Sequence, residues 1–202
     1  MKLYYSPIAC SLSPHIVLHE AGLTFDTEKV DLRAKKTASG ADFTRINSKG
    51  QVPTLQLDNG ETLTEGPAIV QYIADLVPHK KLAPAAGTFE RYRLQEWLNY
   101  ISSEIHKGFT PLFVPTTADE WKPTLVNALV ARFGFVATQL EGRDYLLGDT
   151  FTVADAYLFT TMNWCKFMNI DLGQWPVLKA YHERIAARPA VQKAVQAEGI
   201  TL

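Results

Sequence analysis

The first part of the chain alternates short apolar runs with turn residues, the pattern of strands interleaved with helices. Strand-like runs lie at residues 3–5, 27–32, 54–57 and 62–63, and helix-like stretches at residues 13–21 and 67–76. A helical stretch joins the first two strands, which is typical of a parallel β-α-β unit. Asp58-Asn59-Gly60 predicts a hairpin between the last two strands, because Asn-Gly tolerates the positive φ angles of a type I′ turn. We therefore expect a small mixed sheet with helices.

From about residue 89 to the end, the apolar positions recur with helical spacing. One apolar stripe with 4, 3, 4 spacing is formed by Leu94, Leu98, Ile101 and Ile105. A polar stretch with Pro and Gly, residues 78–88, precedes this pattern and is typical of a linker. The pattern predicts an N-terminal domain at residues 1–77 and an all-helical domain at residues 89–202.

Polar residues follow the border of that apolar stripe. Asn99, Ser103 and His106 are spaced by 4 and 3 residues and so share one side of the predicted helix. Taken alone, such a row is more often a solvated helix flank than a site.

A capping box is predicted at Thr152 and Asp155. The Thr152 hydroxyl would accept from the Asp155 amide while the carboxylate reaches back to the start of the helix. An apolar run at residues 156–159 follows, so we expect a central, buried helix.

The charge balance argues against polyanionic partners. Lys and Arg number 20, Asp and Glu number 21, and the net charge is -1, which gives no broad attraction to nucleic acid or anionic lipid. No stretch approaches the roughly 20 apolar residues of a membrane span, and the opening residues lack the apolar run of a signal peptide. With two distant cysteines, the chain is also no disulfide scaffold. We expect a cytoplasmic protein without nucleic-acid or membrane partners.

Cys10 is the first candidate for chemistry. It follows a strand and a turn, and it precedes Ser13, a candidate helix cap, and Pro14, which suits a first helical turn. A helix N-terminus favours an anion and is a setting that lowers the pKa of a thiol. The Cys-x-x-Ser spacing lacks a resolving thiol, so a disulfide made by Cys10 would join it to another molecule. An inert packed cysteine explains these residues equally well.

Two further segments suit an extended, zwitterionic ligand. Val52-Pro53 precedes the third strand, where a cis bond would leave the Val52 backbone groups open to a peptide. Glu65-Gly66-Pro67 begins a helix whose first amides can hold a carboxylate, while Glu65 can pair with an ammonium. The alternative for Glu65 is an ordinary acidic residue at a helix start.

Other chemistries lack their motifs. His15 and His19 are spaced like two metal ligands, but no third ligand and no H-E-x-x-H pattern accompany them, so we expect no metal. Cys165 lies in a segment that we expect to be buried. The sequence contains no nucleophile elbow, P-loop or Gly-rich dinucleotide turn.

These motifs together resemble the glutathione S-transferase family over nearly the whole chain. They are the Val-Pro pair, the Asp-Asn-Gly hairpin, the Glu-Gly-x-Ala-Ile segment and the Phe-Thr-x-Ala-Asp box. The segments YYSPIACSLSPH and EWLNYISSEIHKGFTPLF are similar to the bacterial beta class, including members linked to the degradation of aromatic pollutants. The resemblance implies an α/β plus all-α fold, with a thioredoxin-like N-terminal domain followed by a helical C-terminal domain.

The resemblance also implies how glutathione would lie on the N-terminal domain. Cys10 corresponds to the residue that meets the glutathione sulfur, and the Val52 backbone to the contact with the cysteinyl part, ahead of a cis-proline at Pro53. Lys35 corresponds to a residue near the glycyl end.

The γ-glutamyl end of glutathione is implied to bind at Glu65 and Gly66. Much of the wider superfamily has Ser where this chain has Gly66, so backbone amides must hold the carboxylate there. Members similar to the beta class share this glycine.

The helical domain is implied to supply the second wall of the site. The corresponding residues are Asn99, Ser103, Glu104, His106 and Lys107, with His106 closest to the chemistry. Phe109, Phe113 and Trp164 are candidates for the hydrophobic part of the wall.

The implied activity is transfer of glutathione to a small hydrophobic electrophile, by conjugation or dehalogenation. Two alternatives remain: a monothiol disulfide oxidoreductase that uses Cys10, and a non-enzymatic ligand binder on the same fold. The resemblance further implies glutathione as co-substrate, no metal, and a homodimer.

Overall fold

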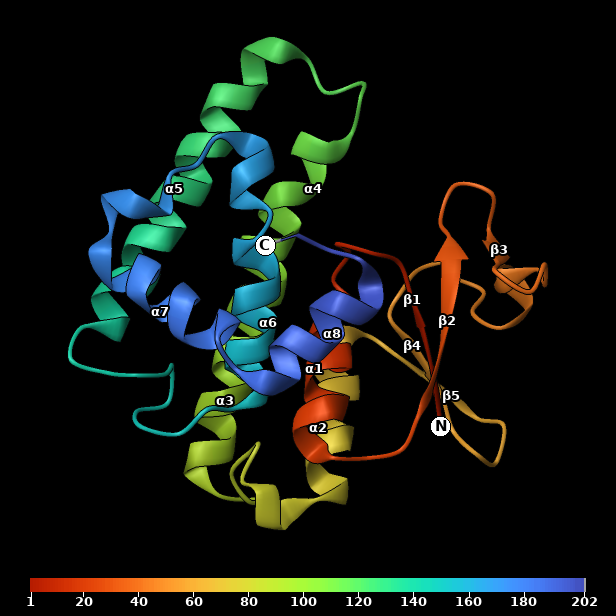
Figure 1. Ribbon diagram of the computed structural model, residues 1–202. Helices are drawn as coiled ribbons and strands as arrows, with labels where there is room; N and C mark the ends of the chain where they lie inside the picture. The colour runs from red at the N-terminus through yellow and green to blue at the C-terminus, as the bar shows by residue number, and fades with distance from the viewer. Residues whose placement is uncertain (202) are drawn as a thin grey trace. The chain divides into compact units, whose positions relative to one another are not determined.

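The computed structural model describes residues 1–201 and contains two compact units, each considered by itself. Unit 1 comprises Met1–Ala83 and the segment from Ala187 onward, and unit 2 comprises Pro84–Ala186. Figure 1 follows the chain from the strands of unit 1 into the helices of unit 2 and back. Within residues 1–201, no helix has both the length and the apolar character needed to cross a membrane.

Unit 1 is built on a five-stranded mixed sheet with the order β3-β2-β1-β4-β5. The strands are β1 (Lys2–Tyr5), β2 (Asp26–Asp31), β3 (Lys36–Thr37), β4 (Thr54–Gln56) and β5 (Thr62–Thr64). β1 and β2 are parallel, and the other neighbouring pairs are antiparallel. The four predicted strands and the parallel β-α-β unit are confirmed. β3 escaped prediction because two residues cannot show a period.

The predicted hairpin between β4 and β5 is confirmed, but its turn is of another type. Only Gly60 has a positive φ, at 88°, whereas a type I′ turn would need Asn59 there as well. The amide of Gly60 donates to the Leu57 carbonyl at 3.0 Å, and the amide of Leu57 donates to Glu61 at 2.8 Å. The connection is therefore a three-residue loop that ends in a left-handed glycine.

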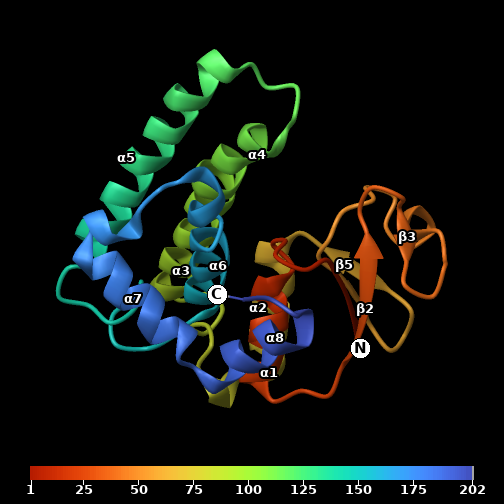
Figure 2. The ribbon, with the colours of Figure 1, turned by 45° about the horizontal axis from the view of Figure 1, so that its top comes forward.

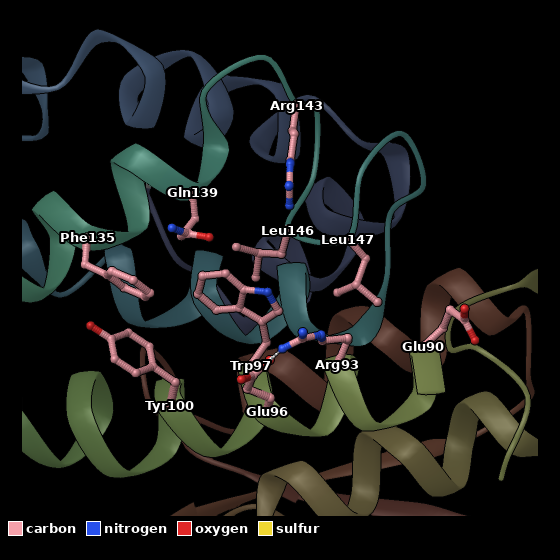
Figure 3. Close-up of a pocket in the computed structure, with 10 residues that line it drawn as sticks. All are labelled: Glu90, Arg93, Glu96, Trp97, Tyr100, Phe135, Gln139, Arg143, Leu146 and Leu147. Carbon is pink, nitrogen blue, oxygen red and sulfur yellow. Dashed lines mark hydrogen bonds and ion pairs between the residues drawn. The ribbon is translucent and has the colours of Figure 1, made fainter. Parts of the chain in front are cut away.

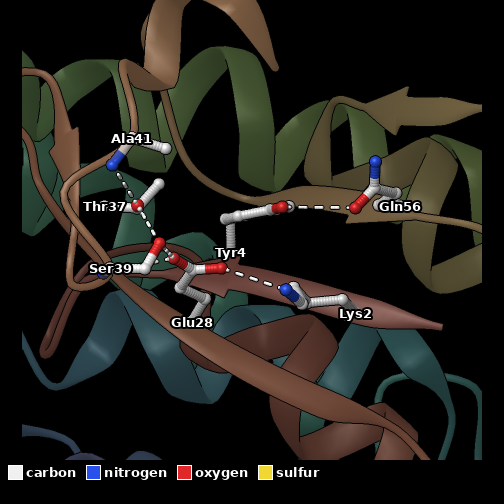
Figure 4. A network of polar contacts seen from close by, with 7 residues as sticks. All are labelled: Lys2, Tyr4, Glu28, Thr37, Ser39, Ala41 and Gln56. Carbon is white, nitrogen blue, oxygen red and sulfur yellow. Dashed lines mark hydrogen bonds and ion pairs between the residues drawn. The ribbon is translucent and has the colours of Figure 1, made fainter. Parts of the chain in front are cut away.

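A polar network ties together β1, β2 and the segment after β3 (Figure 4). The Glu28 carboxylate accepts from the Lys2 ammonium at 3.1 Å and from the Ser39 hydroxyl at 2.5 Å. The hydroxyl oxygens of Ser39 and Thr37 lie 3.0 Å apart. Chiefly because Ser39 donates to it, the pKa of Glu28 is lowered to about 2. The ionised carboxylate therefore helps to hold this edge of the sheet.

Three α-helices belong to unit 1: α1 (Leu12–Ala21), α2 (Gly66–Leu76) and α8 (Pro189–Glu198). Both α2 and α8 pack against α1, and Figure 2 shows α8 beside it. Short 3-10 turns lie at Phe43–Arg45 and Pro78–Lys80.

The last helix differs from the sequence-based division, which assigned residues 89–202 to one helical domain. Glu198 lies 2.8 Å from the Nδ1 of His15 on α1, and Arg188 pairs with Glu20 at 2.6 Å. The apolar face of α8, including the buried Val191, packs within unit 1. Helical periodicity identifies such a helix but does not say which core it covers.

Unit 2 is helical. Its elements are α3 (Phe89–Tyr100), a π-helix (Ile101–His106), α4 (Lys107–Phe113), α5 (Lys122–Leu140), α6 (Val153–Met162) and α7 (Pro176–Ala186), with 3-10 turns at Asp119–Trp121, Cys165–Met168 and Leu172–Gln174. The predicted apolar stripe is confirmed, because its four residues are at most 1% exposed: Leu94, Leu98, Ile101 and Ile105. Every residue of α6 is buried, as expected for a central helix.

The predicted capping box at the start of α6 is present. Asp155 is fully buried, and its carboxylate accepts from the Thr152 amide at 2.8 Å and from the Thr152 hydroxyl at 2.9 Å. It also accepts from the Leu146 amide and the Tyr181 hydroxyl, each at 2.9 Å. One carboxylate therefore joins α6 to the preceding loop and to α7.

Candidate functional site

Cys10 lies just before the N-terminus of α1, as predicted, one residue before the N-cap Ser11. The helix begins at Leu12, so Ser13 is inside it and is not the cap. The Ser11 hydroxyl instead bonds the backbone of Ser6, accepting from its amide at 3.1 Å and donating to its carbonyl at 3.2 Å. These bonds close the turn that presents Cys10.

The Cys10 thiol meets the backbone of the Val52-Pro53 segment. Its Sγ donates to the Val52 carbonyl oxygen at 3.3 Å, and the Val52-Pro53 peptide bond is cis. A carbonyl that accepts from a thiol favours the neutral form over the thiolate. A ligand that takes over the Val52 backbone would remove this restraint on ionisation of Cys10.

Lys35 bonds to the backbone of the same loop. Its ammonium donates to the Gly50 carbonyl at 2.8 Å, two residues before Val52. Lys35 itself has a left-handed backbone with φ 55°. Lys35, predicted to lie near the glycyl end of glutathione, is thus held next to Val52, which was predicted to contact the cysteinyl part.

Glu65 occupies an unusual position at the start of α2. It is the N-cap residue, with φ 70° and ψ 114°, a region that costs a residue with a side chain about 1 to 3 kcal/mol. Its carboxylate is paired at 2.6 Å with the ammonium of Lys49, which also donates to the Thr64 hydroxyl at 2.9 Å. Glu65 therefore already binds an ammonium group. Lys49 was not predicted, because nothing in the sequence links it to Glu65.

Gly66 follows Glu65 in the chain and lies close to Pro53 of the cis peptide bond. It is the first residue of α2, and a Cβ added to it would lie 3.9 Å from Pro53 Cγ, an ordinary contact distance. The first amides of a helix have no intrahelical acceptor and favour an anion. The six predicted residues of unit 1 are therefore brought together around the segment 49–53: Cys10, Lys35, Val52, Pro53, Glu65 and Gly66.

The predicted residues of unit 2 lie on and around the π-helix, where one extra residue per turn changes the direction of the side chains. Such insertions are frequent at functional sites. Asn99, Ser103 and Lys107 are exposed. Glu104 is half-buried and pairs with Arg132 at 3.0 Å, so it is held by unit 2 itself.

His106 is the last residue of the π-helix and is half-buried. Its Nδ1 lies 2.7 Å from the hydroxyl oxygen of Tyr157 on α6. The indole of Trp164 packs edge-to-face against the imidazole, with ring centroids 4.9 Å apart. Tyr157 was missed from the sequence because it lies 51 positions away, within an apolar run.

The three aromatic candidates differ in exposure. Phe113 is 48% exposed, whereas Trp164 is 5% exposed and Phe109 is fully buried. Phe109 packs behind Trp164 with centroids 5.5 Å apart. The expectation that all three form an open hydrophobic wall is therefore wrong for the buried Phe109 and Trp164, which support Phe113 from within.

The remaining candidates stay outside the site. Cys165 is buried, as expected, and burial raises the pKa of its thiol to about 12. His15 pairs with Glu198 rather than with a metal-ligand set. Within residues 1–201, no group of three or more His, Cys, Asp or Glu side chains is placed to hold a metal ion.

Unit 2 also contains a pocket of about 540 Å³ (Figure 3). Side chains of α3, α5 and the following loop line it, among them the aromatic residues Trp97, Tyr100 and Phe135. The predicted site residues are not among the ten that line this pocket, so it is distinct from the predicted site.

Comparison with known proteins identifies both parts of the chain. The family model for the glutathione S-transferase N-terminal domain matches residues 9–76, and the model for the C-terminal domain matches residues 100–189. A curated relative, glutathione S-transferase GstA of Escherichia coli O157:H7, is 46% identical over 99% of this chain and 100% of its own length.

Solved structures agree with these matches. The bacterial glutathione S-transferase BphK, in a ternary complex, is 61% identical with a TM-score of 0.97, covering 99% of this chain and 100% of its own. A bacterial beta class glutathione S-transferase from Sphingomonas chungbukensis is 48% identical with a TM-score of 0.96, covering both chains completely.

Proposed function

This chain belongs to the glutathione S-transferase family, and we propose that it joins glutathione to small hydrophobic electrophiles, including halogenated aromatic compounds. The observation that carries the proposal is the contact of the Cys10 thiol with the Val52 carbonyl, next to the N-terminus of α1 and beside the cis-proline Pro53. A sphingomonad glutathione S-transferase that is 48% identical to this chain was solved in complex with glutathione. That complex supports glutathione as the co-substrate.

In this proposal glutathione binds along the segment 49–53 of unit 1. Its cysteinyl backbone pairs with Val52, and its α-ammonium takes the place of the Lys49 ammonium at Glu65. The α-carboxylate of the γ-glutamyl end accepts from the first amides of α2 at Gly66. The Lys35 ammonium pairs with the glycyl carboxylate. These contacts together place the glutathione sulfur next to Cys10.

The residues of unit 2 that the sequence assigned to the site stay part of the proposal. His106 donates to the glutathione sulfur, while Asn99, Ser103, Glu104 and Lys107 contribute polar contacts. Phe113 supplies apolar surface for the electrophile, and Trp164 packs against it at a ring centroid distance of 5.9 Å.

The reaction needs no cofactor beyond glutathione. The glutathione thiol loses its proton to solvent, and the thiolate attacks the carbon that carries the halogen. A sulfur–carbon bond forms, the carbon–halogen bond breaks, and the halide leaves with the bonding electron pair. Donors fixed in advance around the sulfur stabilise the thiolate without reorganising during the reaction.

A second candidate function is thiol-disulfide exchange at Cys10. The Cys-x-x-Ser spacing favours it because no resolving thiol follows Cys10. A disulfide-bond oxidoreductase of Escherichia coli, YfcG, is 26% identical over 96% of this chain, which supports the same chemistry on this fold. Exchange would pass through a mixed disulfide between Cys10 and glutathione.

We further infer a homodimer in the cytoplasm. Free cysteines, one of them half-buried at the surface turn, suit a reducing compartment. Sedimentation analysis of the purified chain tests the dimer.

Chloride release provides the test of function. The enzyme is mixed with glutathione and an activated aryl chloride, and free chloride and the thioether product are both measured. We expect equal amounts of the two. Chloride release no faster than in buffer would refute conjugation and dehalogenation, and a glutathione mixed disulfide turned over faster than the aryl chloride would favour exchange.

Calorimetric titration with glutathione tests the binding residues separately. Because the Glu65 side chain is 68% exposed, its loss should cost about 0.5 to 1 kcal/mol of binding free energy, a weakening of about twofold to fivefold in Glu65→Ala. Asp58→Ala, which removes an exposed carboxylate of the β4–β5 loop, is the matched control. Equal affinities of the two variants would refute the role of Glu65.

A further inference from the structure

Two side chains of unit 2 hold the imidazole of His106. Its Nδ1 lies 2.7 Å from the Tyr157 hydroxyl oxygen, and Tyr157 is 2% exposed, so this bond forms away from bulk solvent. The Tyr157 and Trp164 rings both meet the imidazole edge-to-face, at interplanar angles of 85° and 68°. Packing against these two rings limits rotation of the imidazole and keeps Nδ1 directed at the hydroxyl.

The hydrogen bond at Nδ1 determines what the other ring nitrogen can do. A neutral imidazole has one N–H donor and one bare acceptor nitrogen. A bare imidazole nitrogen is a better acceptor than a phenol oxygen, whose lone pair is partly delocalised into the ring. The Tyr157 O–H therefore donates to Nδ1, and the proton of the neutral ring resides on Nε2.

The charged groups around this turn do not reverse that assignment. Glu104, the acidic residue of the π-helix, pairs with Arg132 of α5 at 3.0 Å. Lys107 follows His106 directly and is exposed. The group that lies against Nδ1 is the Tyr157 hydroxyl, whereas a backbone carbonyl or a carboxylate in that place would favour the Nδ1–H tautomer.

We propose that Tyr157 is a positioning residue that fixes His106 as the Nε2–H tautomer, so that His106 donates a hydrogen bond to the glutathione sulfur and does not act as the base. This inference rests on the proposed function and specifies the role of His106 within it. The thiol proton goes to solvent, Nε2 keeps its own proton, and the thiolate attacks while held by the Nε2–H donor. The protonation state of His106 is the same before and after the step.

The tautomer can be read directly by nitrogen NMR of the histidine rings. The chain has 5 histidines, and a His106→Ala sample identifies the signals of His106 by their loss. We expect a protonated Nε2 and a bare Nδ1 in the protein without glutathione. A protonated Nδ1 would overturn the proposal. Because the NMR signals do not depend on activity, they test the tautomer of His106 separately from the proposed function.

Substitution of His106 shows whether its side chain acts as a hydrogen-bond donor or as a base. In His106→Gln the side-chain amide nitrogen lies near the place of Nε2 and can donate, but it cannot accept a proton at neutral pH. Loss of a fixed donor to a developing anion costs about a hundredfold or more in rate. We therefore expect His106→Ala to lose about that much, and His106→Gln to retain at least about tenfold more activity than His106→Ala. Equal losses in the two variants would refute the donor role.

Tyr157→Phe tests the positioning role, because it removes one hydroxyl and keeps the ring packing. We expect kcat to fall about threefold to tenfold near pH 6.5, with little change in the KM for glutathione, since only part of one donor interaction is lost. The deficit should shrink near pH 9, where glutathione is ionised even in water, because a free thiol has a pKa of about 8.5.

Tyr181→Phe is the matched control. It also removes a buried tyrosine hydroxyl from unit 2, but that hydroxyl donates to Asp155. We expect it to lower stability and leave the pH profile of kcat unchanged. If Tyr157→Phe lowers the melting temperature but keeps the wild-type pH profile and the wild-type NMR tautomer, its role is structural and the proposal fails.

Discussion

Removing the buried carboxylate of Asp155 should destabilise unit 2 far more than removing either of its side-chain partners. In Asp155→Ala the acceptor of four hydrogen bonds disappears. The Leu146 amide, the Tyr181 hydroxyl and the Thr152 hydroxyl then remain as donors in a region where these residues are at most 3% exposed. Neighbouring backbone carbonyls and water can satisfy only part of this set.

The expected magnitude follows from these contacts. A buried polar group left without a partner costs about 1 to 3 kcal/mol, and relief of the buried charge offsets part of the total. We therefore expect Asp155→Ala to lower the free energy of unfolding by about 4 kcal/mol. Thr152→Ala and Tyr181→Phe each remove one side-chain partner and should cost about 1 to 2 kcal/mol. For a chain of this size, 1 kcal/mol shifts the melting temperature by about 2 to 4 °C.

Tryptophan fluorescence during urea unfolding is the appropriate assay. All 4 tryptophans lie in unit 2, at positions 97, 121, 164 and 175, so the signal reports on the unit that contains Asp155. The double variant Thr152→Ala/Asp155→Ala should be about as unstable as Asp155→Ala alone, because the two residues share their hydrogen bonds. Glutathione affinity at low temperature, where the variants are folded, should match that of the parent.

The reasoning would be refuted by an Asp155→Ala variant no less stable than Thr152→Ala. Strict additivity in the double variant would also contradict it, because additivity would mean that the two side chains act independently.

Three other predictions follow from the two units. Gly66→Ser should tighten glutathione binding about fivefold in calorimetry, because a Cβ fits there and the hydroxyl adds a donor; weaker binding would contradict the fit. Mild oxidation with glutathione should add one glutathione to Cys10 and none to Cys165, whose burial raises its pKa to about 12, and peptide mass mapping would expose the reverse. The pKa of Glu28 is lowered from 4.5 to about 2, so its contribution to stability is present above pH 4.5 and lost as the pH falls toward 2. The destabilisation caused by Glu28→Gln should therefore shrink over that range in acid-unfolding experiments, and a constant difference would contradict the lowered pKa of Glu28.

The sequence by itself determined much of the local structure. Alternating and helical periods located four strands, the helices and the buried stripe that runs through α3 and the π-helix, because each signal lies within a short window. The capping box was readable for the same reason, since Thr152 and Asp155 are three positions apart. Resemblance of several motifs together, rather than any one of them, led to the family.

Only the tertiary structure decided which distant groups meet. The pairing of Lys49 with Glu65, the bond between His106 and Tyr157, and the packing of α8 on α1 join segments that no local window spans. Periodicity also failed to separate an open aromatic wall from the fully buried Phe109 behind it. A one-dimensional pattern records whether a side chain prefers water or a core, whereas its partner is chosen by the path of the whole chain.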